Sequence, residues 1–212
     1  DWEKLIFNTD KASTLQLTPP IMAYNLTDGW AVLPYRDCPT LLEQNLAIDI
    51  KVTKCAETLH RVHQQPLEFD KFDLHSEVTN YIQMLDSIER QTYWLNKMAT
   101  LPALPEVDYY SDSSMLQPCH MDLSFANILS NDEVLDWEYA RQALPIVDIA
   151  ACATINQLNR QQSEALLQHY NQLSGYDYQA DELFVYCAWC DFLNELWYQI
   201  AESSPDALMR LE

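Results

Sequence analysis

The chain has 212 residues, of which 48% are hydrophobic, and this is enough for one large folded domain with a real core. It carries 32 Asp and Glu against 12 Lys and Arg, a formal net charge of -20, so nucleic acid and anionic membrane surfaces would be repelled. The same charge would favour a cationic substrate, although an acidic solubilising surface explains it equally well.

The six cysteines show no tight disulfide framework, which predicts reduced thiols in a cytoplasmic protein. Cys187 and Cys190 form a C-x-x-C pair, but no second pair follows and the surroundings have helical periodicity. We therefore predict packing cysteines instead of a redox or zinc site. No signal segment opens the chain, and no run of about 18 apolar residues occurs in it.

The first predicted element is a β-hairpin within residues 18–35, because two short apolar runs flank Asp28 and Gly29. Thr40 and Glu43 then resemble a capping box, and apolar residues at helical steps predict a helix from there to Pro66. A second long helix is expected to be capped by Asp73 and to end before residue 102.

Residues 102–118 lack a clear period, and their prolines predict a surface connection or a short capped helix. Next, residues 128–130 and 134–136 are predicted to form two short strands of a hairpin. Helices follow over 147–158 and over 163–173, the second closed by Gly175, and Asp181 can cap a long final helix with two apolar faces. The whole order indicates an α+β protein dominated by helix.

A candidate catalytic motif lies between these helices. His120, Asp122 and Asn127 fit H-x-D-x-x-x-x-N, and Asp136 follows at the end of the predicted hairpin. In phosphoryl transfer, such an Asp accepts the substrate hydroxyl proton, while the Asn and a second Asp hold Mg²⁺ at the phosphates. The three-residue motif alone also arises by chance, so the hairpin and the second Asp carry much of the inference.

Three neighbouring side chains have open roles. His120 is a candidate catalytic residue, although a His at the head of such a loop more often fixes loop geometry by hydrogen bonding than transfers a proton. Glu138 could contact a second ion or a cationic substrate, or be solvated. Asp148 could brace the catalytic loop or cap the helix that follows it.

These residues resemble the aminoglycoside phosphotransferase and choline kinase superfamily. The resemblance rests on HMDLSFAN at 120–127, LDWEYA at 135–140 and VDIA at 147–150. The DWEYA run and a final helix rich in Trp and Tyr are most similar to the thiamine kinase and choline kinase branch. The order of elements matches over roughly residues 15–200, and the central thirty residues carry nearly all of the specificity.

The resemblance implies a bilobal protein-kinase-like fold with ATP as donor, Mg²⁺ and a small, often cationic, hydroxylated acceptor. Asp122 would act as base, with Asn127 and Asp136 as metal ligands. The linker between the lobes would contact the adenine, and its residues here are Leu33, Pro34 and Tyr35. Cation recognition would use Glu138 together with aromatic side chains, for which ordinary core packing is the alternative; the candidates are Trp189, Trp197 and Tyr198.

The N-terminal part departs from the family pattern. Members begin with a sheet that bears a phosphate-covering loop and a Lys, whereas this chain has only two glycines, neither in such a loop, and Lys4 and Lys11 are poorly placed to substitute. We therefore expect residues 1–37 to be a remnant of the N-terminal lobe with the linker, and residues 38–212 to be the helical C-terminal catalytic lobe. Because the chain starts at Asp1, we expect further residues upstream in the native protein.

The leading hypothesis is an ATP- and Mg²⁺-dependent kinase of a small alcohol of the thiamine, choline, ethanolamine or aminoglycoside type. The alternative is a non-catalytic kinase-like module that binds a small cation or a protein without a complete nucleotide site. A metal-dependent hydrolase is disfavoured because the chain lacks a His-rich ligand set.

Overall fold

The computed structural model of the chain describes residues 2–105 and 115–203. In chain order, the elements of these stretches are α1 (Trp2–Thr14), β1 (Ala23–Asn25), β2 (Trp30–Val32), α2 (Ile48–His63), α3 (Leu74–Met84), α4 (Ile88–Met98), β3 (Gln117–Cys119), β4 (Arg141–Ala143), α5 (Pro145–Ile155), α6 (Arg160–Ser174) and α7 (Ala180–Ser203). Two small antiparallel sheets, β1 with β2 and β3 with β4, accompany the helices. The predicted α+β class with a helical majority is therefore confirmed. Most of the connection predicted over 102–118 lies outside the described residues.

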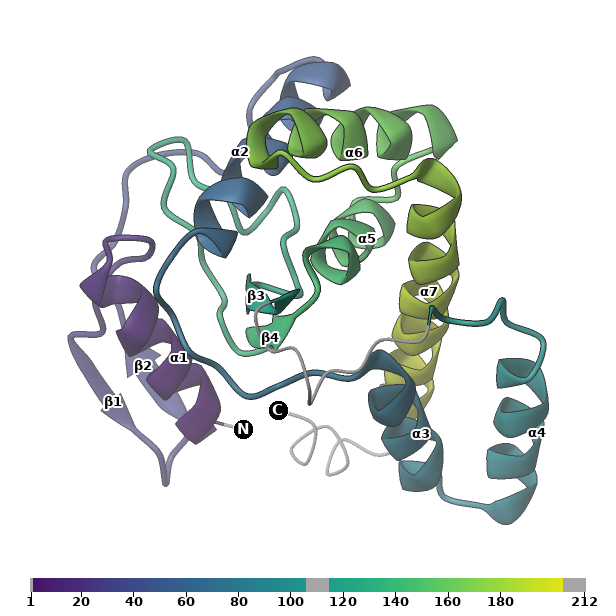
Figure 1. Cartoon of the computed structure of the whole chain (residues 1–212). Coiled ribbons are helices and arrows are strands. Elements are labelled where there is room, and N and C mark those ends of the chain that lie inside the picture. Colours follow the sequence, from purple (N-terminus) through teal and green to yellow (C-terminus); the bar gives the residue numbers. More distant parts are fainter. Residues whose placement is uncertain (1, 106–114, 204–212) are drawn as a thin grey trace.

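The N-terminal part consists of α1 and a short hairpin (Figure 1). The predicted hairpin is confirmed: Ala23 pairs with Val32, and Gly29 adopts a φ of 64° in the turn. Glycine enters this left-handed region without the steric cost that a Cβ atom would bring. From α1, the Asn8 side-chain amide donates to the Trp137 carbonyl oxygen at 3.0 Å. The N-terminal helix is thereby joined to the segment that carries the candidate motif.

The first long helix begins later than predicted. The contacts of a capping box are present, since the Thr40 N–H donates to the Glu43 carboxylate at 2.8 Å, but they close a short turn and α2 starts at Ile48. The predicted start was wrong because this segment pairs with the hairpin of the motif, where the Leu41 N–H donates to the Ile128 carbonyl at 2.7 Å. Because these backbone groups already have hydrogen-bond partners, the segment does not depend on helical hydrogen bonds to satisfy them.

The second predicted long helix is in fact two helices. α3 follows Asp73, whose carboxylate accepts a hydrogen bond from the Ser76 N–H at 2.7 Å, as predicted. The uninterrupted continuation was wrong, because Leu85 is extended and a new N-cap starts α4, with the Ser87 hydroxyl accepting from the Arg90 N–H at 3.3 Å. Apolar residues keep a helical spacing across the break, so periodicity alone does not reveal it.

The last three helices form the body of the molecule. α7 packs along α5 and α3, and α2 packs against α6 (Figure 1). Gly175 ends α6 with a φ of 78°, as predicted. Asp181 does not cap the final helix, because α7 already begins at Ala180 and Asp181 lies in its first turn. Both apolar faces of α7 are buried, which fits the expected central helix; the buried residues are Leu183, Tyr186, Trp189, Cys190, Phe192, Leu196 and Ile200.

Five of the six cysteines, all except Cys38, lie in the hydrophobic core or pack against it. All six lie in the described stretches and are free thiols. Burial raises the pKa of Cys187 to about 12 and that of Cys190 well above its usual value, so neither supplies a thiolate near neutral pH. Within the same stretches, no helix is both long and apolar enough to cross a membrane.

The cap between α3 and α4 generates a stability prediction. Ser87→Ala should lower the free energy of unfolding by about 1 kcal/mol, because the first turn of α4 loses its side-chain acceptor. Urea unfolding followed by circular dichroism measures this. Ser76→Ala is the matched control: Ser76 is exposed in the first turn of α3 and should change stability by less than about 0.5 kcal/mol. Equal losses for the two variants would contradict the assignment.

Candidate active site

The candidate catalytic loop begins where β3 ends, at Cys119. β3 pairs with β4, so two antiparallel strands close the base of the intervening segment, residues 120–140. Met121, at the head of the loop, adopts a φ of 68°, a conformation that residues with side chains rarely adopt. Such backbone strain persists only where surrounding contacts enforce it, and it clusters at functional sites.

A short hairpin returns the chain to the loop. The Leu135 N–H donates to the Asn127 carbonyl at 2.8 Å, and Ile128 forms a β-bridge with Val134. The predicted hairpin is therefore present, as a single bridge with flanking hydrogen bonds. Asp136 follows with a φ of 65°, which redirects the chain immediately after the bridge. The hairpin thus brings Asp136 back beside Asn127.

The buried carboxylate of Asp148 holds the head of the loop. Its two oxygens accept hydrogen bonds from the backbone N–H groups of His120 and Met121, each at 2.8 Å. One oxygen also lies 2.9 Å from Nε2 of His63, whose Nδ1 lies 2.7 Å from the hydroxyl of Tyr170. Of the two roles considered for Asp148, the structure confirms the brace, because Asp148 lies inside α5 and not at its N-cap.

His63, Cys119 and Asp148 lie close enough together to hold a metal ion, since one ligand atom of each lies within 4.8 Å of the others. Their donors are already used, because the Cys119 thiol donates to the Ala143 carbonyl at 3.6 Å and burial raises the pKa of Cys119 well above its usual value. Burial raises the pKa of Asp148 too, but the hydrogen bond and charge of His63 outweigh this and hold it below its usual value. The group is therefore a hydrogen-bonded brace.

His120 is fully buried, and both of its ring nitrogens meet the backbone. Nε2 lies 2.9 Å from the Leu135 carbonyl oxygen, and Nδ1 lies 3.3 Å from the backbone nitrogen of Asp122. A donor on one side and an acceptor on the other require a neutral ring, and burial lowers the pKa of His120 accordingly. His120 thus ties the catalytic loop to the segment that leads into Asp136.

Asn127 contacts Asp122 directly. Its side-chain nitrogen lies 2.9 Å from the Asp122 carbonyl oxygen and 3.2 Å from the carboxylate oxygen Oδ2. Burial raises the pKa of Asp122 to about 7, the charges of Asp136 and Glu138 add to the rise, and the Asn127 hydrogen bond opposes it. A carboxyl group that titrates near neutral pH suits a general base.

The predicted metal ligands fit a hard divalent cation. Asn127 uses its amide nitrogen toward Asp122, which leaves the amide oxygen as its ligand atom, and Asp136 contributes a carboxylate. Oxygen donors of this kind are what Mg²⁺ prefers. The mutual repulsion that raises the pKa of Asp122 is also what a nearby divalent cation would relieve. The residues present therefore fit the ion.

Sequence reasoning missed a second brace at the C-terminal end of α5. The side-chain oxygen of Asn156 accepts from the Phe125 N–H at 2.7 Å, and its nitrogen donates to the Leu123 carbonyl at 3.0 Å. These bonds hold the loop between Asp122 and Asn127. An Asn at a helix end is typical of a cap, so the sequence contains no signal for this longer-range role.

Three aromatic side chains, Trp197, Tyr139 and Tyr81, lie beside the carboxylates, and the sequence analysis identified only Trp197. Trp197 of α7 donates its indole N–H to the Tyr139 hydroxyl at 3.2 Å. Burial raises the pKa of Tyr139, and the charges of Glu138, Tyr81 and Asp122 contribute, so these groups are neighbours. Tyr139 lies within the DWEYA run and could have been included on that ground, whereas Tyr81 carries no local signal.

Trp189 lies in a different environment. Its side chain is only 5% exposed, its indole N–H donates to the Pro102 carbonyl at 2.8 Å, and its ring lies 5.6 Å from that of His75 in α3. The structure therefore places this indole in the core between α3 and α7. It does not join Trp189 to the carboxylate group.

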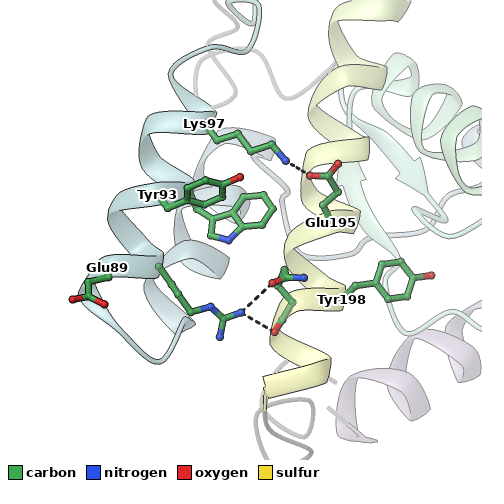
Figure 2. A pocket seen from close by; sticks show the side chains of 8 residues that line it. Glu89, Tyr93, Lys97, Glu195 and Tyr198 are labelled. Carbon is green, nitrogen blue, oxygen red and sulfur yellow. Dashed lines mark hydrogen bonds and ion pairs between the residues drawn. The ribbon is translucent and has the colours of Figure 1, made fainter.

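Tyr198 is at the rim of a separate hollow of about 680 Å³ between α4 and α7. Figure 2 shows Lys97 paired with Glu195 across this hollow, while Tyr198 extends from the side of α7 away from α4. The Arg90 guanidinium also donates to the Gln199 side-chain oxygen at 3.2 Å. These polar groups satisfy one another and hold α4 against α7. The residues around this hollow do not repeat the contact between a carboxylate and an amide that Asp122 and Asn127 form. We therefore take the loop around Asp122 as the candidate active site.

The predicted adenine-contacting linker, residues 33–35, follows β2 directly. Its two large side chains, Leu33 and Tyr35, are exposed. From residue 39 onward the chain runs along the motif hairpin, where the Ser130 N–H donates to the Pro39 carbonyl at 2.9 Å. The linker is therefore anchored to the segment that carries Asn127.

Both N-terminal lysines are already paired. Lys4 lies 3.7 Å from the Asp70 carboxylate. Lys11 donates to the Glu68 carbonyl, and its ammonium lies 4.0 Å from the centre of the Phe7 ring. These contacts agree with the expectation that neither lysine is placed to bind phosphates.

The raised pKa of Asp122 makes a stability prediction. Between about pH 4 and pH 7 the folded chain keeps a proton on Asp122 that the unfolded chain loses, so wild-type stability should fall through this window. Asp122→Asn cannot ionise and should therefore exceed wild-type stability at pH 8 by on the order of 1–3 kcal/mol. Urea unfolding of both proteins at pH 4 and pH 8 measures the difference. An advantage of Asn that is the same at both pH values would contradict the raised pKa.

Comparison with known proteins points to the same chemistry. Residues 23–184 match the family described as the phosphotransferase enzyme family. Over 131 residues the chain is 28% identical to protein LicA from Haemophilus influenzae (strain ATCC 51907 / DSM 11121 / KW20 / Rd), which covers 59% of this chain and 49% of that protein. The chain therefore spans about half the length of this relative.

Solved structures show the same fold. The choline kinase LicA from Streptococcus pneumoniae superposes with a TM-score of 0.70 at 20% identity, covering 93% of this chain and 71% of that chain. The aminoglycoside phosphotransferase APH(3'')-Id from Streptomyces rimosus ATCC10970 gives 0.59 at 15% identity, covering 90% and 80%. At these identities the likeness establishes the protein-kinase-like fold alone. Because the family match spans well over half of its residues, the chain belongs to the phosphotransferase enzyme family.

Proposed function

We propose that this chain carries the catalytic lobe of an ATP- and Mg²⁺-dependent phosphotransferase that acts on the hydroxyl group of a small cationic metabolite. The observation that carries the proposal is the half-buried Asp122 carboxylate, which contacts Asn127 and has a pKa raised to about 7 by burial and by Asp136 and Glu138. A base with this pKa is partly deprotonated at neutral pH and can still accept a proton effectively.

The proposed reaction is a direct transfer of the terminal phosphoryl group. The acceptor oxygen attacks the γ-phosphorus of ATP, its hydroxyl proton passes to the carboxylate of Asp122, and the bond between the γ-phosphorus and the bridging oxygen breaks to release ADP. Asn127 orients the Asp122 carboxylate through its amide. His120 would act as a positioning residue, because both of its ring nitrogens face the backbone.

Asn127 and Asp136 would hold Mg²⁺, which when bound neutralises charge on the phosphates. The positive φ of Asp136 and the hairpin bridge fix the two side chains at the ends of one rigid segment. Such preorganisation matters because catalysis of phosphoryl transfer consists largely of positioning and electrostatic stabilisation.

Two relatives support a nucleotide donor. One LicA structure is described as a complex with AMP, and the Streptomyces rimosus enzyme has been solved with ADP and streptomycin. In this chain, the backbone of Leu33, Pro34 and Tyr35 is the proposed adenine contact, because the linker follows β2 and is open to solvent on its outer side. Residues 1–37 would then be the remnant of the N-terminal lobe with the linker, and residues 38–212 the catalytic lobe.

The acceptor class follows from the groups beside Asp122. Glu138 supplies negative charge, and Tyr139 and Trp197 supply aromatic surface in contact with each other. A ring face attracts a quaternary ammonium or similar cation by roughly 0.5–2 kcal/mol. Together with the likeness to LicA, this favours a choline, ethanolamine or thiamine type of acceptor over an aminoglycoside.

Loss of the base should abolish turnover. In the full-length protein, Asp122→Ala is expected to lower kcat for Mg²⁺-dependent ADP release with choline by about 10²–10⁴-fold, because the acceptor proton loses its receiver. A coupled ADP assay with choline, ethanolamine and thiamine measures this. Asp177→Ala removes an exposed carboxylate in the loop before α7 and should leave kcat unchanged. Acceptor binding by calorimetry without any turnover would instead favour the non-catalytic binding module.

Aromatic recognition has its own test. Trp197→Leu should raise KM for a cationic acceptor by about 3- to 30-fold, which corresponds to the loss of one cation–π contact, while Trp197→Phe should restore most of the affinity. A melting curve establishes that both variants fold. Tyr93→Leu is the control: Tyr93 is an exposed aromatic residue of α4, and its substitution should leave KM unchanged. If Trp197→Leu and Tyr93→Leu raise KM equally, the assignment of Trp197 is wrong.

A further inference from the structure

An ion pair joins the linker to the motif hairpin. Arg36, the residue after the proposed adenine contact, lies against Glu133 with Nε 2.5 Å from Oε2 and Nη2 2.7 Å from Oε1. The two residues are 97 positions apart in the sequence. Glu133 stands in the turn of the hairpin whose two ends carry Asn127 and Asp136, so the pair connects two parts of the proposed nucleotide site.

The pair is better fixed than most surface ion pairs. The guanidinium plane meets both carboxylate oxygens, which gives two parallel hydrogen bonds and a defined orientation. The carboxylate is only 16% exposed and also accepts from the Asn131 amide at 2.8 Å. The hydrogen bond from Arg36 lowers the pKa of Glu133 and the one to Glu133 raises the pKa of Arg36, so both groups stay charged near neutral pH.

The hairpin turn is held by α2 as well. The Arg61 guanidinium donates to the Asp132 carbonyl, and Asp132 itself adopts a φ of 68°. The turn therefore has a fixed place relative to α2, and Arg36 adds a direct link from the turn to the linker. A bound nucleotide would have to meet the linker with its base and the metal ligands with its phosphates at the same time, so the spacing of these two parts matters.

We propose that Arg36 and Glu133 are positioning residues that fix the spacing between the nucleotide-contacting linker and the metal-binding hairpin. This inference rests on the proposed function. It makes the protein's affinity for the nucleotide depend on a side-chain contact that is remote from the phosphates. Without the pair, the backbone bonds from residue 39 onward still hold the chain to the hairpin, but the linker before them loses its direct tie to the hairpin turn. A Mg²⁺-nucleotide must then restore the spacing of the two parts when it binds.

The test is a charge-reversal cycle on the full-length protein. Arg36→Glu and Glu133→Arg should each weaken Mg²⁺·ADP binding by about 10-fold in calorimetry and raise KM for ATP similarly, as for other residues that orient a ligand shell. kcat at saturating ATP should change little. The double variant re-forms the pair in reverse and should recover affinity to within about 3-fold of wild type.

The matched control is the pair between Arg160 and Glu164 on α6, which has a comparable Nε–Oε1 distance of 3.0 Å but lies within one helix. Charge reversal there should leave nucleotide binding unchanged. Single variants that lower the melting temperature without altering Mg²⁺·ADP affinity, or a double variant no better than the singles, would overturn the inference while the proposed function stands. Wild-type protein that binds no Mg²⁺·ADP overturns both.

Discussion

The candidate site depends on one buried carboxylate, that of Asp148. A charge in the protein interior is costly unless it is paired and fully hydrogen-bonded, and here two backbone N–H groups of the loop and the ring of His63 satisfy it. Removal of one partner from such a buried pair typically costs on the order of 3–5 kcal/mol. The head of the catalytic loop is therefore fixed to the same core that stabilises the helical body, and Tyr170 extends this connection to α6.

This anchoring allows the site to keep features that oppose folding. Met121 and Asp136 have left-handed backbone conformations, and the charges of Asp136 and Glu138 disfavour the ionised form of Asp122. Neither feature would persist in a loosely held segment, because strain and repulsion relax when the chain can move. The site thus trades local stability for a carboxyl group with a raised pKa, and the core around α5 supplies the rigidity that this requires.

The sequence predicted the parts of the structure that depend on neighbours along the chain. The motif spacing placed Asp122, Asn127 and the hairpin, and the Gly-containing turns and most helix bodies were also found. The predictions failed where contacts between residues distant in the sequence determine the local structure. α2 starts later than predicted because residue 41 forms a hydrogen bond with Ile128. Asn156 braces the loop through hydrogen bonds to residues more than thirty positions away. Periodicity carries no information about such contacts, so Tyr81 and the pairing of Arg36 with Glu133 could not have been predicted.

The three parts of the proposed site are joined in different ways. Most of the proposed metal-binding and acceptor-binding groups come from one short run, since Asp136, Glu138 and Tyr139 are nearly consecutive and covalent geometry sets their spacing. Asn127 joins this run through the hairpin, and Trp197 joins it through a hydrogen bond to Tyr139. The nucleotide-contacting linker belongs to the N-terminal part of the chain, and only non-covalent contacts such as the Arg36–Glu133 pair set its distance from the same metal ligands. Substitutions at the first junction should therefore alter chemistry and acceptor choice together. Substitutions at the second can change nucleotide affinity alone, because the bond-forming groups keep their mutual arrangement.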